Sequence, residues 1–307
     1  MPQQVGATEY QAVGQKRWVW PAFAAPGVVW LLLLFLVPFY AVFAIAMGQT
    51  DPIFNRAQPE WNPIYWDPAA FGRVLEDLFA GQLGRVALRT IAYVFIASLI
   101  CLVLGYPVAY FVSRRSGRWR GLWLLLILAP FWINYLMRMM AWVNLLSPGA
   151  QMDQAFFLFG LDPPSWLAGH HFVVILGLVY GYIPFLILPL FGSLDRIDEA
   201  TLEAARDLGA SPSRTFWRVT LPLSKQGILA GLVIIMLPMF GDYYTQNLVS
   251  GSPRTRMLGN AIDGFINQTS SQGGVGAALT VVLMVFVAGL MAYYLITVTR
   301  ATREAQE

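Results

Sequence analysis

Residues 171–192 read HFVVILGLVYGYIPFLILPLFG, a run without any Asp, Glu, Lys or Arg. A helix needs about 20 consecutive apolar residues to cross a hydrocarbon layer of roughly 30 Å, and this run is long enough to do so. Asp162 and Asp195 bound it on either side. The run therefore predicts a membrane-spanning helix. The same criterion, the length of an apolar run, identifies further spans in the rest of the chain.

Five further runs of this kind bring the number of predicted spans to six. They lie within residues 18–50, 90–113, 121–146, 226–249 and 275–298. Two of them contain a charge, Arg138 in the third span and Asp242 in the fifth. Several contain proline, which membrane bundles absorb as kinks. The predicted fold class is all-α, a polytopic membrane protein with six transmembrane helices.

The composition agrees with this class and excludes others. Of 307 residues, 57% are hydrophobic and only 12% are charged, which is more apolar than a soluble domain of this length tolerates. Membrane lipid is therefore an expected partner. Lys16 and Lys225 are the only lysines and the arginines are scattered, so no basic surface for nucleic acid is expected. The single cysteine, Cys101, excludes an intramolecular disulfide.

The distribution of basic residues predicts the orientation, because cytoplasmic loops carry an excess of Lys and Arg. The termini and alternate connections hold 13 of the 20 basic residues: Lys16, Arg17, Arg114, Arg115, Arg118, Arg120, Arg196, Arg206, Arg214, Arg218, Lys225, Arg300 and Arg303. Both termini are therefore predicted to be cytoplasmic, with an arm at 1–17, a membrane domain at 18–299 and a tail at 300–307. The first run is too long for the core of a cleaved signal peptide, so it is expected to be retained.

The connection at 195–224, between the fourth and fifth spans, is longer than a simple turn requires. Small or apolar residues recur in it at helical spacing: Leu194, Ile197, Thr201, Ala204 or Ala205, and Leu208. Gly209 suits a left-handed helix end, and Ser211 with Pro212 suits the start of a second helix that leads to Pro222. The connection is predicted to fold as helix, glycine turn and helix, a rigid element that can pass displacement to the adjoining spans.

One spacing in this connection resembles a known family. Glu203-Ala204-Ala205 is followed by three residues, Gly209, nine residues, Val219, one residue and Leu221-Pro222. This pattern resembles the EAA loop of binding-protein-dependent ABC importer permeases, with valine where isoleucine is more usual. In that family the loop docks into a cleft of the nucleotide-binding subunit. The resemblance implies this contact for Glu203, Ala204, Ala205, Asp207 and Gly209.

The same resemblance implies the rest of the assembly. It implies a type I ABC importer permease in a bacterial inner membrane, with two ATP-binding subunits at the cytoplasmic face, a second related permease and an external solute-binding protein. No cofactor is expected in this chain, and ATP and Mg are expected on the ATP-binding subunits. The chain itself has no Gly-rich phosphate loop followed by Lys and Ser/Thr, and no nucleophile with a neighbouring base. It is therefore not expected to be catalytic by itself.

A narrower resemblance covers most of the chain. Residues 129–138 (APFWINYLMR) with Ala141-Trp142, and residues 237–244 (LPMFGDYY) with Leu258-Gly259-Asn260, are similar to the third and fifth spans of spermidine/putrescine-type permeases. The resemblance implies a polyamine cargo. The chain departs from that pattern at Met139-Met140, at 250–252 and at 270–274, so the resemblance is more specific for the type of transporter than for its cargo.

Polar residues inside the predicted spans are candidates for the translocation path. A charge at the bilayer centre costs about 2.5–3.5 kcal/mol on insertion scales, so Arg138 and Asp242 need a partner, water or the headgroup region. Three hypotheses follow: an ion pair between them, a path in which Asp242 and aromatic rings attract a cation, or an interfacial position for both. The candidate path residues are Asn134, Arg138, Trp142, Asp242, Tyr243, Tyr244 and Asn247. Asn134 and Asn247 also suit hydrogen bonds between helices.

Other functions compete with the importer. An ion-gradient-driven secondary transporter would be expected to show inverted repeats and would have no use for an ordered connection at 195–224. An importer of another small cationic or amino-acid-derived solute is a second alternative. A membrane-embedded enzyme is disfavoured, because no cluster of acid, base and metal ligand appears in the sequence. The adjacent pair His170-His171 cannot place both rings on one helix face as a metal site requires.

Overall fold

The computed structural model describes residues 19–51, 53–54, 56–268 and 272–304, and every named element in them is helical. The α-helices of this part are α1 (Val19–Ala46), α2 (Ala69–Ala80), α3 (Gln82–Arg114), α4 (Arg120–Leu128), α5 (Tyr135–Leu146), α6 (Gln151–Leu158), α7 (His171–Asp195), α8 (Glu199–Asp207), α9 (Pro212–Thr215), α10 (Leu221–Leu223), α11 (Lys225–Phe240), α12 (Tyr244–Val249), α13 (Leu258–Asp263) and α14 (Gly273–Glu304). The all-α prediction is confirmed.

Four helices are long and apolar enough to cross a membrane by themselves: α1, α3, α7 and α14. Two further crossings require a bent pair of helical segments, Gly117–Trp132 with Tyr135–Leu158 and Pro212–Leu223 with Lys225–Phe240. The described chain therefore holds four spans, or up to six when each bent pair is counted as one. The arm at 1–17 lies outside the described residues, and α14 continues to Glu304, into the segment predicted as a tail.

The third and fifth predicted spans are not continuous helices. The axis turns by 85° between Trp132 and Tyr135, because Ile133 is extended and the Asn134 side chain caps a new helix. The fifth span ends at Phe240, and Asp242 lies in the break before α12. Pro130 begins the 3₁₀ turn Ala129–Trp132 that follows α4, and Pro238 lies inside α11 shortly before its end at Phe240. The predicted ranges 121–146 and 226–249 are wrong as single helices.

The main core lies between α3, α7 and α11, which pack side by side through the middle of the bundle. Their buried side chains include Val94, Cys101, Leu178, Leu186 and Ile235. Gly227 allows α11 to approach α7, since a Cβ atom there would lie 2.3 Å from the Ser193 Cβ. Close packing of this kind is typical of helices in membranes, where small residues let backbones meet.

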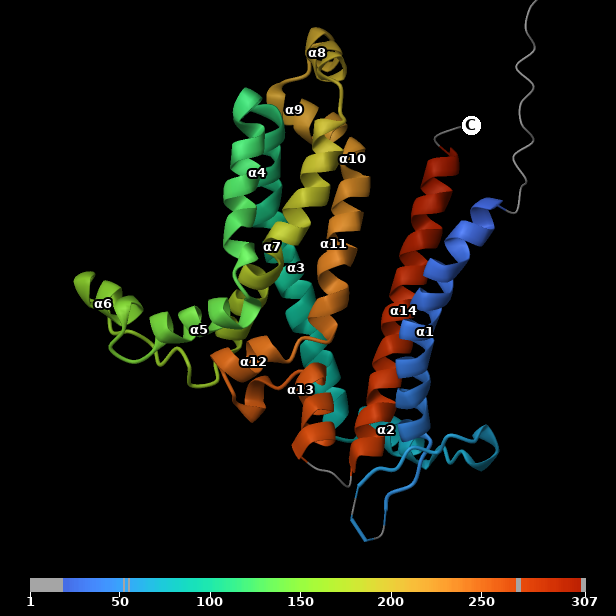
Figure 1. Ribbon diagram of the computed structural model, residues 1–307. Coiled ribbons are helices and arrows are strands. Elements are labelled where there is room, and N and C mark those ends of the chain that lie inside the picture. The colour runs from blue at the N-terminus through green and yellow to red at the C-terminus, as the bar shows by residue number, and fades with distance from the viewer. Residues whose placement is uncertain (1–18, 52, 55, 269–271, 305–307) are drawn as a thin grey trace, which may run out of the picture.

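A second core joins α1, α2, the beginning of α3, α13 and α14. It includes Ala46, Val74, Leu83 and Leu279. The α1–α14 pair runs along one side of the molecule, and only 6% of the apolar window of α1 is buried (Figure 1). A large apolar surface on α1 therefore faces lipid or another subunit.

The two ends of the bundle carry different structures. Helices α8, α9 and α10 gather at one end, together with the beginning of α1 and the end of α14 (Figure 1). Helices α2, α5, α6, α12 and α13 lie at the opposite end. In the second group, α2 occupies the connection between α1 and α3.

Candidate functional site

Helix α8 of the loop begins after Asp198 and ends before Gly209, two residue types that are typical of helix ends. The Asp198 carboxylate is its N-cap and accepts a hydrogen bond from a first-turn amide at 3.3 Å. At the other end, Gly209 has a φ of +81°, and its amide donates to the Arg206 carbonyl oxygen at 2.8 Å. The Ala210 amide donates to the Ala205 carbonyl oxygen at 3.1 Å, which completes a Schellman ending. The predicted left-handed glycine is confirmed.

The second part of the loop is helical, as predicted. Ser211 caps α9, accepting a hydrogen bond from the Arg214 amide at 3.4 Å, and Pro212 begins it as expected. The helix leads to Pro222 as expected, through a π-helical segment, η4 (Phe216–Thr220), that continues into α10. Pro222 stands at the start of α10, where a missing amide proton costs little. The chain then turns by 60° into α11.

The residues assigned to the subunit contact are accessible on the loop. Glu203, Ala204, Asp207 and Gly209 are exposed and Ala205 is partly buried. The residues at helical spacing do not form one buried face: Leu202 is buried whereas Thr201 is exposed, and Leu208 is 89% exposed. The cap at Asp198 restarts the helix, so the spacing counted from Leu194 does not run through. The loop therefore presents a short helix with an apolar tip.

A second group of polar residues lies where the two broken spans meet. We call Tyr135, Arg138, Tyr182, Asp242 and Thr245 the polar cluster; they come from α5, α7 and α12 and the break before α12. Broken helices expose backbone and side-chain polar groups inside a membrane protein, where they are tolerated beside a cavity or other protein groups. The cluster is thus a second candidate site, at the opposite end of the bundle from α8 (Figure 1).

Asp242 is the centre of the cluster and is 7% exposed. Its carboxylate accepts hydrogen bonds from the Thr245 amide at 3.0 Å and the Thr245 hydroxyl at 2.6 Å. The Tyr182 hydroxyl donates to it at 3.1 Å, and the Tyr135 hydroxyl lies at 3.3 Å. Tyr135 is also hydrogen-bonded to Thr245. Asp242 is thus held by hydrogen bonds from three residues of its own chain.

Arg138 is 8% exposed, and its guanidinium lies 4.0 Å from the centre of the Phe131 ring. Tyr135 and Tyr180 follow at 5.5 Å and 5.8 Å, so aromatic rings surround the charge. Its Nε and Nη1 atoms are buried and have no hydrogen-bond partner among the described residues. No ion pair joins it to Asp242, since the described ion pair is that of Arg120 with Asp195. The hypothesis of a direct Arg138–Asp242 pair is not realised.

A cavity of about 420 Å³ opens beside the cluster. Four of the seven candidate path residues line it: Arg138, Asp242, Tyr243 and Tyr244. The rings of Tyr243 and Tyr244 lie 4.0 Å apart, and Tyr244 is 42% exposed. The cavity thus combines one carboxylate, one guanidinium and accessible aromatic faces.

The other three candidate residues lie elsewhere. The Asn134 side chain accepts a hydrogen bond from the Leu136 amide at 2.8 Å and caps α5. Trp142 packs edge-on against Tyr180 at 5.3 Å. The Asn247 side chain accepts a hydrogen bond from Asn260 at 2.9 Å, which joins α12 to α13. The second role considered for Asn247, a hydrogen bond between helices, is present.

Three members of the cluster were not singled out from the sequence: Tyr135, Tyr182 and Thr245. Tyr135 lies within the quoted 129–138 motif, but nothing in the sequence links it to Tyr182, which is 47 positions away. Among the described residues no group of three or more His, Cys, Asp or Glu side chains could hold a metal ion. His171, set aside as a ligand, is hydrogen-bonded to the Tyr93 hydroxyl.

Comparison with known sequences identifies a family. The family described as "Binding-protein-dependent transport system inner membrane component" matches residues 101–300. The chain is 36% identical over 235 residues to the spermidine/putrescine transport system permease protein PotB of Escherichia coli K12, covering 76% of this chain and 82% of the relative. It is 33% identical over 267 residues to PotB of Haemophilus influenzae, covering 86% and 89%.

Comparison with solved structures places the fold. A bacterial alginate ABC transporter, in complex with a periplasmic protein that holds an alginate pentasaccharide, contains a chain that matches with a TM-score of 0.72 at 16% identity, over 90% of this chain and 92% of that one. The methionine ABC transporter MetNI, in an inward-facing conformation, matches with a TM-score of 0.54 at 19% identity, over 71% and 95%. At these identities the likeness describes the fold.

Proposed function

The chain belongs to the family of binding-protein-dependent transport system inner membrane components, and from this premise we propose its cargo, its partners and its mode of coupling. It is a multi-pass permease subunit of an ABC importer in the inner membrane. Its proposed cargo is a polyamine of the spermidine/putrescine class, delivered by an external solute-binding protein. The identity to two PotB permeases over most of the chain supports this choice.

The single observation that supports coupling is the ordered, exposed loop at 195–224. The helix α8 is capped at both ends and keeps Glu203, Ala204 and Asp207 exposed. We assign its contact surface to Glu203, Ala204, Ala205, Asp207 and Gly209. Two ATP-binding subunits, which carry ATP and Mg, bind this surface in the proposed assembly, and a second related permease completes the pore. This chain contributes no catalytic group of its own.

We further propose six crossings with both termini in the cytoplasm and the type I importer architecture. The beginning of α1 and the end of α14 lie at the same end of the bundle as α8, as an even number of crossings requires (Figure 1). The basic residues Arg114, Arg115, Arg118 and Arg206 also belong to this end, which agrees with the excess of positive charge in cytoplasmic loops. The domain limits 1–17, 18–299 and 300–307 follow from this topology.

The proposed path for the cargo passes the cavity beside the polar cluster. Asp242 supplies a negative charge, and the faces of Tyr243 and Tyr244 suit an ammonium group through cation–π attraction. Tyr135, Tyr182 and Thr245 hold the carboxylate in place. Asn134, Trp142 and Asn247 support the surrounding helices in this scheme rather than contact the cargo.

One observation favours a second cargo class. The Nε and Nη1 atoms of Arg138 are buried without a hydrogen-bond partner among the described residues, and Arg138 lines the same cavity. A guanidinium with free donors suits a carboxylate, which polyamines lack and amino-acid-derived solutes carry. Ornithine is putrescine with an added α-carboxylate, so the two form a matched pair of probes.

Uptake into proteoliposomes tests the function. The reconstituted transporter with its binding protein is expected to accumulate spermidine only with ATP inside, with the membrane potential collapsed. Accumulation driven by an ion gradient without ATP would instead show a secondary transporter. Equilibrium binding of putrescine and ornithine to the purified transporter then separates the cargo classes: the polyamine proposal predicts tighter putrescine binding, whereas tighter ornithine binding that is lost in Arg138→Gln would favour the second class.

A further inference from the structure

The loop at 195–224 joins the membrane helices at two roots. The first root is the end of α7 with the turn that follows it, residues 194–198. The second root comprises η4, α10 and Ser224, which lead into α11. A force applied to α8 must pass through these roots before it reaches the membrane helices.

Arg114, at the end of α3, holds the first root. Its Nη2 atom donates to the Leu194 carbonyl oxygen at 2.6 Å and to the Ile197 carbonyl oxygen at 2.8 Å. These carbonyls close the C-terminal end of α7, where the backbone carries partial negative charge and a cation is favoured. The residues they belong to are buried in the main core. The bonds are partly buried, and the guanidinium charge strengthens them.

Two aromatic residues of the same helix hold the second root. The Phe216 ring of η4 packs edge-on against Tyr106 at 5.7 Å and Tyr110 at 6.0 Å. The Tyr106 hydroxyl is also hydrogen-bonded to the Ser224 hydroxyl at 2.9 Å, and Ser224 is fully buried. Edge-to-face aromatic pairs add about 0.5–1.5 kcal/mol beyond the area that they bury.

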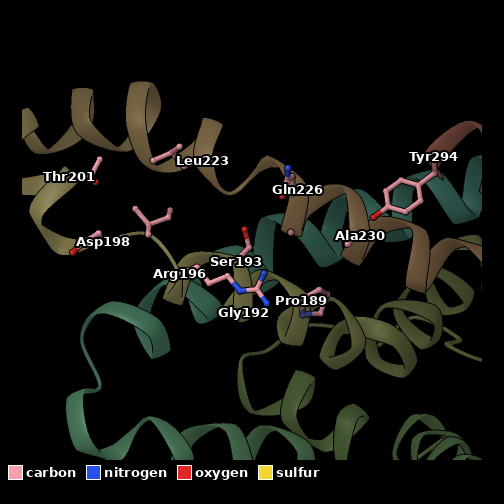
Figure 2. A pocket seen from close by; sticks show the side chains of 12 residues that line it. Pro189, Gly192, Ser193, Arg196, Asp198, Thr201, Leu223, Gln226, Ala230 and Tyr294 are labelled. Atoms are coloured by element: carbon pink, nitrogen blue, oxygen red, sulfur yellow. The ribbon is translucent and has the colours of Figure 1, made fainter. Parts of the chain in front are cut away.

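Tyr106, Tyr110 and Arg114 are spaced four residues apart on α3, so they form one stripe along a single face of that helix. The opposite side of the roots is open. A cavity of about 710 Å³ lies there, between α7, α11 and Tyr294 of α14, and no residue of α3 lines it (Figure 2). The roots are thus attached to α3 on one side and have free space on the other.

We propose that the stripe of Tyr106, Tyr110 and Arg114 clamps both roots to α3, so that the loop and the cytoplasmic half of α3 move as one body when the ATP-binding subunits displace α8. This inference rests on the proposed coupling role of the loop. It assigns α3 a direct part in transmission, besides α7 and α11, which the loop connects covalently. The cavity beside α14 provides room for this displacement.

Interspin distances measure the clamp directly. Nitroxide labels at Arg115→Cys and Ser213→Cys, both exposed positions, report the separation of α3 from the loop in a Cys101→Ala background. In the assembled transporter the distance distribution is expected to be narrow and to stay unchanged when ATP with vanadate is added. A nucleotide-dependent shift of this distance in the otherwise native transporter would overturn the proposal.

Substitutions in the clamp are the second part of the distance experiment. Arg114→Met removes both hydrogen bonds, and Arg114→Met with Phe216→Ala is expected to broaden the distribution at least twofold even without nucleotide. Arg114→Lys keeps the charge and is expected to recover most of the narrow distribution. Arg120→Gln is the matched control, because its ion pair with Asp195 joins the same region but is exposed. An unchanged distribution in the double variant would overturn the clamp.

The test of the clamp can fail or succeed independently of the proposed coupling role. Broadening without nucleotide depends only on the contacts within this chain and needs no bound ATPase subunit. Failure of the ATP-binding subunits to associate with the native chain would contradict the coupling role. The distance distributions of the native and variant chains without nucleotide could still be compared. Where the subunits associate, Arg114→Met is expected to keep ATP hydrolysis within about twofold of native, whereas uptake falls about tenfold or more.

Discussion

The loop at 195–224 and the polar cluster are organised in opposite ways. The loop is shaped by contacts between near neighbours in sequence: the Asp198 and Ser211 caps and the Schellman ending at Gly209. The polar cluster is formed by contacts across 107 and 60 positions, from Tyr135 and Tyr182 to Asp242. One site is encoded locally and the other depends on how distant helices pack.

The two regions also differ in what their side chains contact. Most loop residues proposed for the subunit contact are exposed, whereas Asp242 is surrounded by donors from its own chain. A locally capped surface helix tolerates changes in the rest of the molecule, but a buried carboxylate does not. Substitutions in the loop should therefore affect coupling, and substitutions in the cluster should affect both stability and passage of the cargo.

Gly209→Val should have the largest effect. A β-branched residue at a φ of +81° costs about 1–3 kcal/mol, so the ending of α8 should rearrange. We expect uptake to fall about 10- to 100-fold while the chain still inserts. Uptake of spermidine and co-purification of the ATP-binding subunits provide the measurement.

Gly209→Asn is the matched control, because asparagine tolerates the left-handed region. It should retain most of the uptake. Native uptake and native association of the ATP-binding subunits in Gly209→Val would show that the loop does not transmit force, and the contrast between the two regions would lose its functional meaning.

Asp242→Asn should have an intermediate effect. It removes the negative charge at almost constant shape, so we expect the maximal uptake rate at saturating, cargo-loaded binding protein to fall about three- to tenfold. ATP hydrolysis and assembly should stay close to native. Unchanged uptake over a full concentration series would return Asp242 to a purely structural role.

Tyr182→Phe sharpens this test. It removes one hydrogen bond to Asp242 and keeps the charge, so the stability of the protein should fall by about 1 kcal/mol, measured as a lower melting temperature in detergent. Uptake should change less than in Asp242→Asn. Equal losses of uptake in the two variants would indicate that only the structure of the cluster matters.

Arg120→Gln should have a small effect. The Arg120–Asp195 ion pair is 2.8 Å long, but the two side chains are 53% and 34% exposed. Exposed pairs contribute about 0–1 kcal/mol, so uptake should stay within about twofold of native and should be insensitive to added salt. A loss comparable to that of Arg114→Met would show that the surface pair, and not the buried bonds, holds the loop.

Labelling of single cysteines should leave activity unchanged and report only the topology. Ser213→Cys should be shielded from membrane-impermeant thiol reagents in intact cells, and Ser252→Cys should react. Ser116 is a poor choice for the same purpose, because it is buried and hydrogen-bonded to Val112. Reaction at Ser213 from outside would reverse the proposed orientation and remove the loop from the cytoplasm.

Much of the loop could be predicted because its signals are local. Gly209, Ser211 and Pro212 appear in the sequence next to the turns that they make. The inward face of α8 could not be predicted as easily, since the cap at Asp198 shifts the phase of the helix relative to α7. That shift buries Leu202 and exposes Leu208.

The broken spans show the limit of apolar length as a criterion. Residues 121–146 and 226–249 are long enough to cross a membrane, yet both break at a turn near a proline. Prolines also occur inside α3 and α7, which stay continuous. Whether a proline is absorbed or ends a helix depends on the neighbours that satisfy the freed backbone groups, and those neighbours are distant in sequence.

The sequence by itself determined the membrane class, the helix–glycine–helix loop and the resemblance to importer permeases, because apolar length, capping residues and motif spacing act between near neighbours. Only the tertiary structure decided that Asp242 is held by Tyr135, Tyr182 and Thr245, and that Arg114 holds the end of α7 instead of serving only as a topological charge. A buried charge takes its role from the donors and acceptors that packing brings within about 3 Å of it. Apart from Thr245, which lies three positions from Asp242, those partners come from helices that are far apart in the chain.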